Sequence, residues 1–243
     1  MSKVVIVTGG SRGIGAATAK LLGAKGYAVC VNYLANRELA DDAADCIIRA
    51  GGRAFACQAD VSSEADVIGL FDAAEERFGK VTHLVNNAGI LFTQSKLVDI
   101  DLERFNQVLN SNVVSCFLCS REAVRRFPAG SAIVNVSSLA SQTGSPSEYV
   151  DYAASKGAMD TLTKGLSREV AGSGIRVNAV RPGFIYTDMH ADGGEPGRVD
   201  RLAPQIPMQR GGSAEEVANT IAWLLSDEAS YVTGSFIDVA GGR

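Results

Sequence analysis

Short runs of consecutive apolar residues alternate along the chain with longer segments in which apolar residues recur at helical spacing. The apolar runs predict seven strands: Lys3–Thr8, Tyr27–Tyr33, Ala54–Gln58, Leu84–Asn86, Ala132–Val136, Ile175–Val180 and Phe236–Val239. The segments between them predict helices: Ala16–Lys25, Asn36–Ala50, Glu64–Phe78, Leu102–Phe127, Tyr152–Ala171 and Ala214–Leu225.

Strands with few polar positions are typical of a parallel sheet that is covered on both faces. Strands that alternate with helices form right-handed βαβ units. We therefore predict an α/β fold: a doubly wound (Rossmann) parallel sheet of about seven strands with helices on both faces, in a single domain over residues 1–243. Residues 188–212 are rich in proline and glycine, and we expect them to form a flap over the substrate within that domain.

The composition argues against several classes of protein. Of 243 residues, 46% are apolar, and 23 basic residues stand against 27 acidic ones, a net charge of −4. That balance argues against a dedicated nucleic-acid binder and against disorder. No apolar run is long enough to predict a membrane span, and the run at Val4–Val7 is too short for a signal peptide. The five scattered cysteines indicate reduced thiols and a cytoplasmic protein.

A glycine-rich segment, TGGSRGIG over residues 8–15, joins the first predicted strand to the first predicted helix. Small residues allow the backbone to turn tightly and approach a pyrophosphate, to which the helix N-terminus offers N–H donors and the positive end of its dipole. The glycine spacing is Gly-x-x-x-Gly-x-Gly. The alternative is a tight strand–helix turn that binds no ligand.

Tyr152 and Lys156 stand four residues apart at the start of a predicted helix and therefore share one face. A nearby ammonium favours the phenolate, so we expect Lys156 to lower the pKa of Tyr152 and make it a proton donor or acceptor near neutral pH. Ser138 follows the fifth predicted strand, where its hydroxyl could bond a substrate oxygen. The alternatives are a solvated helix edge for the Tyr–Lys pair and a cap or turn for Ser138.

These motifs occur along the chain in one order: the glycine-rich segment, Asp60-Val61, NNAG over residues 86–89, Asn112, Ser138, Tyr152, Lys156 and Pro182-Gly183. Each motif alone is weak, but the ordered set is specific and spans essentially the whole chain. The set resembles the short-chain dehydrogenase/reductase family. The likeness is greatest to the bacterial branch with 3-oxoacyl-carrier-protein reductases, glucose 1-dehydrogenases and uncharacterised oxidoreductases.

The resemblance implies an oxidoreductase that transfers a hydride between a nicotinamide coenzyme and a ketone or secondary alcohol. Tyr152 would be the general acid, Lys156 would hold the nicotinamide ribose, and Ser138 would orient the carbonyl. Asn112 would bind a water that relays protons to Lys156. The segment between Ser138 and Tyr152 is one residue longer than in the commonest members, which affects the expected shape of the loop over residues 141–151.

The resemblance also implies the coenzyme contacts. They are Gly9, Ser11, Arg12, Gly13, Ile14, Gly15, Asn32, Tyr33, Leu34, Asp60, Val61, Asn87, Ala88, Gly89, Tyr152, Lys156, Pro182, Gly183, Ile185 and Thr187. Of these, Asp60 would contact adenine, and Ile185 and Thr187 would hold the nicotinamide carboxamide.

We expect the coenzyme to be NADP(H), with NAD(H) as the alternative. Enzymes that use NAD place an acidic residue at the end of the second strand to bind the ribose 2′-hydroxyl, and residues 29–34 contain none. The guanidinium of Arg12, inside the glycine-rich segment, could instead hold a 2′-phosphate. Arg37 is a second candidate for that role.

Three other functions stay open: a sugar 1-dehydrogenase that uses both coenzymes, a 3-oxoacyl-carrier-protein reductase, and a regulator that senses NADP(H) without turnover. Some carrier-protein reductases place basic residues just before the fifth and sixth strands, and here Arg125 and Arg126 lie nearby.

Cys116 and Cys119 form a Cys-x-x-Cys pair within a predicted helix. We expect them to be buried small side chains rather than a zinc or redox site. We expect a small free carbonyl or alcohol substrate, no metal, no nucleic-acid or membrane partner, and a homotetramer, as is common in the family.

Overall fold

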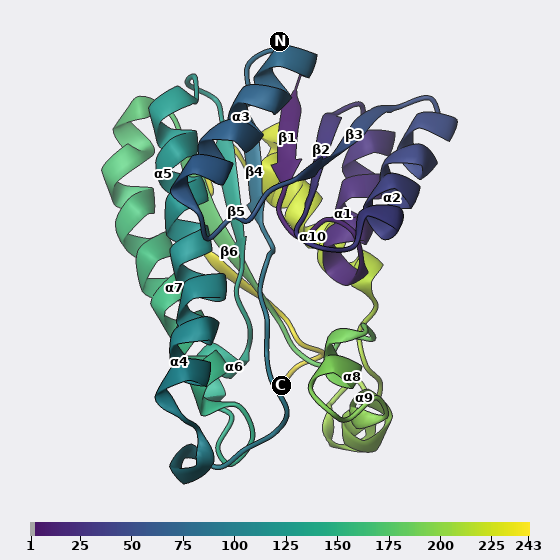
Figure 1. Cartoon of the computed structure of the whole chain (residues 1–243), viewed down its shortest axis with the longest axis vertical. Coiled ribbons are helices and arrows are strands. Elements are labelled where there is room, and N and C mark those ends of the chain that lie inside the picture. The colour runs from purple at the N-terminus through teal and green to yellow at the C-terminus, as the bar shows by residue number, and fades with distance from the viewer. Residues whose placement is uncertain (1–2) are drawn as a thin grey trace.

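The sheet places the first strand of the chain near its centre. In the computed structural model, which describes residues 3–243, the strands are β1 (Val4–Val7), β2 (Ala28–Tyr33), β3 (Arg53–Gln58), β4 (His83–Asn86), β5 (Ala132–Val136), β6 (Arg176–Pro182) and β7 (Phe236–Val239). They lie in the order β3-β2-β1-β4-β5-β6-β7, and every pair is parallel. The predicted doubly wound sheet is confirmed (Figure 1).

Helices cover both faces of the sheet. They are α1 (Gly13–Ala24), α2 (Arg37–Arg49), α3 (Glu64–Phe78), α4 (Leu102–Leu109), α5 (Ser115–Arg126), α6 (Ala140–Thr143), α7 (Val150–Val170), α8 (Met189–Asp192), α9 (Arg198–Leu202) and α10 (Ala214–Leu225). Successive strand residues face opposite sides. Val5 and Val7 therefore share a core with α1, α2 and α10, whereas Val4 and Ile6 share one with α3 and α5.

One predicted helix is divided in the structure. We expected a single helix over residues 102–127, but α4 and α5 are separated by a π-helical turn over Asn110–Val114. There the amide N–H of Ser115 bonds the carbonyl of Asn110, five residues earlier, so one extra residue enters the helix. Asn112 lies in the middle of this turn and is fully buried. Most other predicted boundaries shift by one to three residues.

The strand order creates a crevice beside β1. β2 and β3 lie on one side of β1, and β4 to β7 lie on the other. The connections that follow β1 and β4 therefore leave the sheet in opposite directions, and a crevice opens between them at the carboxyl ends of the strands. In an open α/β sheet this switch point is where ligands bind.

Residues 188–212 follow the carboxyl end of β6. They form α8, α9 and a 3₁₀ turn over Ala203–Gln205, and they return to the sheet where Ile185 and Gly212 form an isolated bridge. Figure 1 shows α8 and α9 at the end of the molecule to which the strands point. This is the position at which we expected a flap, and the flap's role stays a prediction.

Candidate active site

The glycine-rich segment between β1 and α1 requires glycine at three positions. Gly9 and Gly13 have φ angles of +59° and +52°, in the left-handed region that other residues rarely adopt. A Cβ atom at Gly15 would collide with the carbonyl oxygen of Gly9 and lie 2.6 Å from Nδ2 of Asn87. The three glycines therefore allow a tight turn with α1 packed directly against it.

Side chains from three strand ends hold this loop in place. Asn87, after β4, donates from Nδ2 to the carbonyls of Thr8 (3.0 Å) and Gly9 (2.9 Å). The Thr8 hydroxyl accepts from the N–H groups of Asn87 and Ala88. The N–H of Gly9 donates to Oδ1 of Asn32 on β2 (3.3 Å). Neutral hydrogen bonds therefore fix the loop to β1, β2 and β4 together.

A cleft of about 520 Å³ opens between this loop, the end of β2 and the start of residues 188–212. Fourteen of the predicted coenzyme contacts line it: Gly9, Ser11, Arg12, Gly13, Ile14, Asn32, Tyr33, Leu34, Asp60, Val61, Asn87, Ala88, Gly89 and Thr187. Sequence reasoning missed nine lining residues: Ala35, Asn36, Leu39, Ala59, Ser62, Ile90, Ser111, Asp188 and Met189. All but Leu39 lie within two residues of a predicted site residue, so extending each motif slightly would have found them.

The cleft has the features that a dinucleotide needs. Arg12 precedes α1 without a side-chain capping bond, which leaves the first N–H groups of the helix available to a pyrophosphate. A Cβ atom at Gly13 would lie 3.3 Å from Cγ2 of Thr187 and would narrow the cleft. The carboxylate of Asp60 is held by the N–H and hydroxyl of Ser62 (2.9 and 2.6 Å). The residues present therefore fit a nicotinamide dinucleotide.

Six predicted contacts do not line the cleft: Gly15, Tyr152, Lys156, Pro182, Gly183 and Ile185. Gly15 acts through packing, as described above. Pro182 ends β6, and a Cβ atom at Gly183 would lie 2.9 Å from Ala240. Ile185 is buried, and its carbonyl oxygen lies 3.0 Å from Nε2 of His190. Ile185 therefore packs beneath the start of the 188–212 segment.

Tyr152 and Lys156 share the buried face of α7. Nζ of Lys156 donates to the carbonyl of Val136 at the end of β5 (2.8 Å) and lies 5.5 Å from the centre of the Tyr152 ring. A Cβ atom at Gly89 would lie 3.5 Å from this ammonium. Because Gly89 lines the cleft, α7 brings the pair to the edge of the cleft.

Burial governs the pKa values of this pair. It raises the pKa of Tyr152 to about 12, opposed by a hydrogen bond with Ser138. It lowers the pKa of Lys156 to about 8, opposed by the nearby Cys116 and Asp160. The expected lowering of the Tyr152 pKa is therefore wrong in this structure, because burial disfavours the phenolate and raises the pKa overall. Tyr152 is a protonated phenol at neutral pH.

Ser138 lies between β5 and α6 and adopts the turn arrangement considered for it, while its contact with a substrate oxygen stays a prediction. Its Oγ accepts from the N–H of Ala140 (3.1 Å), which makes it a turn residue at the start of α6. Its side chain also hydrogen-bonds that of Tyr152. Because Oγ is an acceptor toward Ala140, the hydroxyl hydrogen is the part that can point at a phenol or carbonyl oxygen.

Asn112 joins the π-helical turn to the segment after β4. Its Oδ1 accepts from the N–H of Ile90 (2.8 Å), and its Nδ2 donates to the Ile90 carbonyl (3.0 Å) and to Oγ of Ser155 (2.9 Å). Both amide hydrogens are in use, so the side chain holds the cleft wall at Ile90 against α7. The water relay that we expected at Asn112 stays a prediction.

The loop with the additional residue docks onto the 188–212 segment. Tyr149 is buried and donates its hydroxyl to the carbonyl of Gly193 (3.3 Å). Arg198, only 4% exposed, pairs with Glu148, and its guanidinium lies 5.1 Å from the centre of the Tyr149 ring. Ser147 has a φ angle of +62°, which is uncommon for a residue with a side chain. The loop therefore forms part of the surface on which the segment rests.

Arg12 has a partner that the sequence analysis did not foresee. Its guanidinium pairs with the carboxylate of Asp192, at the end of α8. The two side chains are 50% and 46% exposed. Among the described residues that line the cleft, Arg12 is the only one with a basic side chain. The ion pair therefore links the glycine-rich segment directly to the 188–212 segment.

Cys116 and Cys119 are buried in α5, and burial raises the pKa of both thiols. They are packed small side chains, as expected. Within residues 3–243, no three His, Cys, Asp or Glu side chains gather into a group that could hold a metal ion. No helix in that range is both long enough and apolar enough to cross a membrane.

Known proteins are similar to this chain in sequence and fold over nearly its whole length. Residues 9–243 match the family model described as enoyl-(acyl carrier protein) reductase. The chain is 62% identical to an uncharacterised oxidoreductase of Escherichia coli (strain K12), over 99% of each chain. It is 38% identical to a 3-oxoacyl-(acyl-carrier-protein) reductase of Staphylococcus aureus (strain Mu50), over 100% of this chain and 98% of the other. It is 37% identical to glucose 1-dehydrogenase 2 of Bacillus subtilis (strain 168), over 99% and 94%.

A solved structure agrees with these relatives. A short-chain dehydrogenase of Burkholderia cenocepacia, in complex with NADP, matches the fold with a TM-score of 0.91 and 37% identity, over 99% of this chain and 97% of that one. Similarity at this level over whole chains shows common family membership. The Staphylococcus and Bacillus relatives are named for different substrates. The chain thus belongs to the short-chain dehydrogenase/reductase family and is an NAD(P)-dependent oxidoreductase.

Proposed function

We propose that the protein catalyses reversible hydride transfer between NADP(H) and a small ketone or secondary alcohol. The observation that carries this proposal is the buried, protonated phenol of Tyr152, which bonds Ser138 and lies beside the Lys156 ammonium. A phenol in this state can give its proton to a carbonyl oxygen, which is general acid catalysis.

In the reduction, the bound nicotinamide would supply the hydride that reaches the carbonyl carbon. The Ser138 hydroxyl would donate a hydrogen bond to the carbonyl oxygen, and Tyr152 would transfer its proton to that oxygen as negative charge develops there. Lys156, held by the Val136 carbonyl, would stabilise the phenolate that remains. Tyr152 would regain a proton through Lys156, with a relay water at Asn112. Residues 188–212 would cover the substrate as a flap.

Two features of the cleft support NADP(H) as the preferred coenzyme. Arg12 is the only basic side chain among its described lining residues. The lining residues at the end of β2 and directly after it, from Tyr33 to Asn36, include no acid that could bind a ribose 2′-hydroxyl. The related Burkholderia structure is a complex with NADP.

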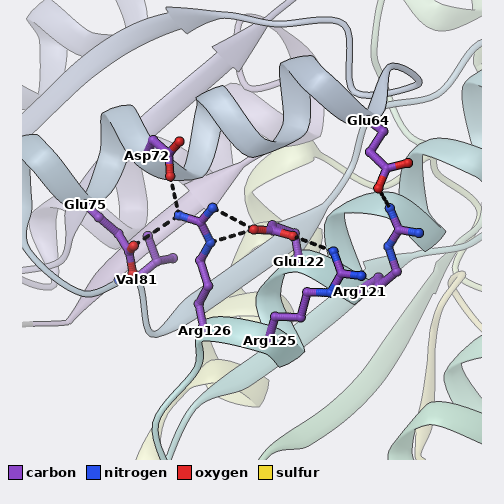
Figure 2. Close-up of polar contacts among 8 residues, drawn as sticks. All are labelled: Glu64, Asp72, Glu75, Val81, Arg121, Glu122, Arg125 and Arg126. Carbon is purple, nitrogen blue, oxygen red and sulfur yellow. Dashed lines mark hydrogen bonds and ion pairs between the residues drawn. The ribbon is translucent and has the colours of Figure 1, made fainter.

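A carrier-bound substrate is the main alternative, and the charges at the end of α5 do not favour it. Arg126 pairs with Asp72, Glu75 (3.1 Å) and Glu122, and Arg125 lies 3.3 Å from Glu122. Figure 2 shows these guanidinium groups facing carboxylates of α3 and α5. Because their charge is neutralised locally, they attract an acidic carrier weakly. We therefore propose small, free substrates.

A turnover assay tests the proposal. Purified protein with NADPH is offered a panel of ketones, and with NADP⁺ a panel of alcohols and sugars, while the near-ultraviolet absorbance of NADPH is followed. We expect turnover of at least one free compound. Coenzyme binding without any turnover would support a regulator that senses NADP(H). Selective turnover of a carrier-bound 3-oxoacyl chain would contradict the proposal of small substrates.

We also propose a homotetramer with twofold symmetry. Leu102 on α4 and Phe117 on α5 are 73% and 44% exposed. Large apolar side chains on neighbouring helices favour burial against a second copy of the chain. Light scattering at micromolar concentration should give four times the monomer mass of 25.4 kDa. A monomer mass would rule the tetramer out.

A further inference from the structure

We propose that Asp192 takes part in coenzyme selection, because it competes with the 2′-phosphate of NADP(H) for the guanidinium of Arg12. This inference rests on the proposed use of NADP(H). It adds a residue from the 188–212 segment, far from the glycine-rich segment in sequence, to the site that distinguishes the two coenzymes. It also makes the position of that segment depend on which coenzyme is bound.

Arg12 is placed to bind either anion. Its backbone precedes α1, its side chain makes no capping bond, and it lines the cleft. A guanidinium binds carboxylates and phosphates through the same planar fork of donors. In this structure one terminal nitrogen of the guanidinium donates to the Asp192 carboxylate. Because both side chains are about half exposed, the ion pair is weak enough for another anion to replace it.

Asp192 gains little from its place in α8. It is the last residue of a single-turn helix, and a negative charge at the C-terminal end of a helix is unfavourable because the exposed carbonyl groups carry partial negative charge. Within residues 3–243, the Asp192 carboxylate bonds only Arg12. The segment around it is anchored separately, through the bond from Tyr149 to the Gly193 carbonyl. Losing Asp192 should therefore leave the fold intact.

The two coenzymes act differently on this ion pair. A 2′-phosphate at Arg12 would lie beside the Asp192 carboxylate, and the repulsion between the two anions drives Asp192 away. A ribose 2′-hydroxyl carries no charge and leaves the ion pair intact. Asp192 therefore lowers the affinity for NADP(H), and α8 is released from the glycine-rich segment when NADP(H) binds but not when NAD(H) binds.

The first experiment measures the dissociation constants of NADP⁺ and NAD⁺ by calorimetry at low salt. Asp192→Asn should tighten NADP⁺ binding about two- to fivefold, the range for losing one exposed ion pair, and leave NAD⁺ binding unchanged. Asp192→Glu should restore the wild-type ratio. In an Arg12→Ala background, Asp192→Asn should have no effect. Asp227→Asn, which removes the exposed pair with Lys3 away from the cleft, is the matched control and should not change the ratio.

Equal changes for both coenzymes in Asp192→Asn would overturn the inference, and so would an undiminished effect in the Arg12→Ala background. Failure to bind either coenzyme would overturn the proposed function and this inference together. Normal binding of both coenzymes without a selective Asp192 effect would overturn the inference alone.

The second experiment follows hydrogen exchange in residues 188–195 at saturating coenzyme. NAD⁺ and NADP⁺ differ only in the 2′-phosphate, so their comparison isolates the adenosine end of the cleft. The segment should exchange faster with NADP⁺ than with NAD⁺ in the wild-type protein, and the difference should vanish in Asp192→Asn. Equal exchange with the two coenzymes in the wild-type protein would contradict the competition.

Discussion

The two walls of the cleft are held by different kinds of interaction. The glycine-rich wall is fixed by neutral hydrogen bonds from Asn32 and Asn87, which connect three strand ends. The wall at residues 188–212 adds exposed ion pairs, among them Arg201 with Glu195 and Arg12 with Asp192, to the bond from Tyr149 to the Gly193 carbonyl and the buried side chains of Val199, Leu202 and Ile206. Exposed ion pairs contribute at most about 1 kcal/mol each, whereas an unpaired buried amide costs about 1–3 kcal/mol.

The difference indicates which parts of the site are formed in advance. The glycine-rich wall cannot rearrange without leaving polar groups unpaired, so it is ready for a coenzyme before one binds. The exposed ion pairs of the opposite wall can be exchanged for water at little cost, so this part of the wall can adapt to a substrate. The buried pair on α7, Tyr152 and Lys156, is also formed in advance, like the glycine-rich wall, because Lys156 is bonded to the Val136 carbonyl at the end of β5.

The largest expected effect separates two tyrosines, one at each wall. Tyr152→Phe removes the proposed proton donor and should lower kcat for carbonyl reduction at least about 100-fold, with NADPH binding nearly unchanged. Tyr149→Phe loses only the bond to the Gly193 carbonyl and should change kcat less than about tenfold. Steady-state kinetics and coenzyme titration measure both. The opposite ranking would move catalysis to Tyr149 and to the adaptable wall.

The next effect concerns the rigidity of the glycine-rich wall. Gly15→Ala introduces a Cβ that collides with the Gly9 carbonyl, and it should lower the free energy of unfolding by about 1–3 kcal/mol and weaken NADPH binding. Gly69→Ala, on the exposed face of α3 with open space around it, should raise stability by up to about 1 kcal/mol. Urea unfolding compares the two variants. If Gly15→Ala kept wild-type stability and NADPH binding, the glycine-rich wall would be able to rearrange around the added Cβ atom, contrary to the proposed rigidity.

A third effect is the pH dependence set by the buried pair. The lowered pKa of Lys156, about 8, means that the ammonium is present below that pH and lost above it, while Tyr152 stays protonated. Carbonyl reduction should therefore be constant up to about pH 8 and decline above it. Asp160→Asn removes a charge that raises the Lys156 pKa, so the decline should begin at lower pH. Profiles of kcat/KM measure this, and identical profiles for both proteins would refute the assignment.

The smallest expected effect lies in the adaptable wall. Glu195→Gln weakens its ion pairs with Arg198 and Arg201 and should lower the free energy of unfolding by less than about 1 kcal/mol. Hydrogen exchange should nevertheless become faster across residues 188–201 and remain unchanged across residues 8–15. A similar acceleration in both regions would mean that the two walls move as one unit.

Features with a local sequence pattern could be predicted. The strands Ala132–Val136 and Phe236–Val239 and the helices Glu64–Phe78 and Ala214–Leu225 have the bounds that their apolar spacing predicts. The glycine spacing located the turn that lines one wall of the cleft, because positive φ angles and close packing leave few other residues acceptable there.

Features that depend on contacts between distant residues could not be predicted. Arg12 and Asp192 are separated by 180 positions, and no local pattern in either segment indicates the other. The division between α4 and α5 was missed because the apolar spacing continues through the π-helical turn. The direction of the Tyr152 pKa shift was wrong because it depends on how deeply the phenol is buried, which the spacing to Lys156 does not reveal.

The π-helical turn over Asn110–Val114 also bears on which insertions and deletions this chain tolerates. An α-helix rotates by about 100° per residue, and this turn accommodates one residue more than a regular helix would. Deleting one residue here would restore regular hydrogen bonding and leave α5 near its present orientation relative to α4, because the π-helical turn accommodates the additional residue. Deleting one residue within α4 or α5 would instead rotate everything beyond it by about 100° and take side chains such as Cys119 out of the core. The chain should therefore tolerate a change of length at this turn better than in the helices on either side of it.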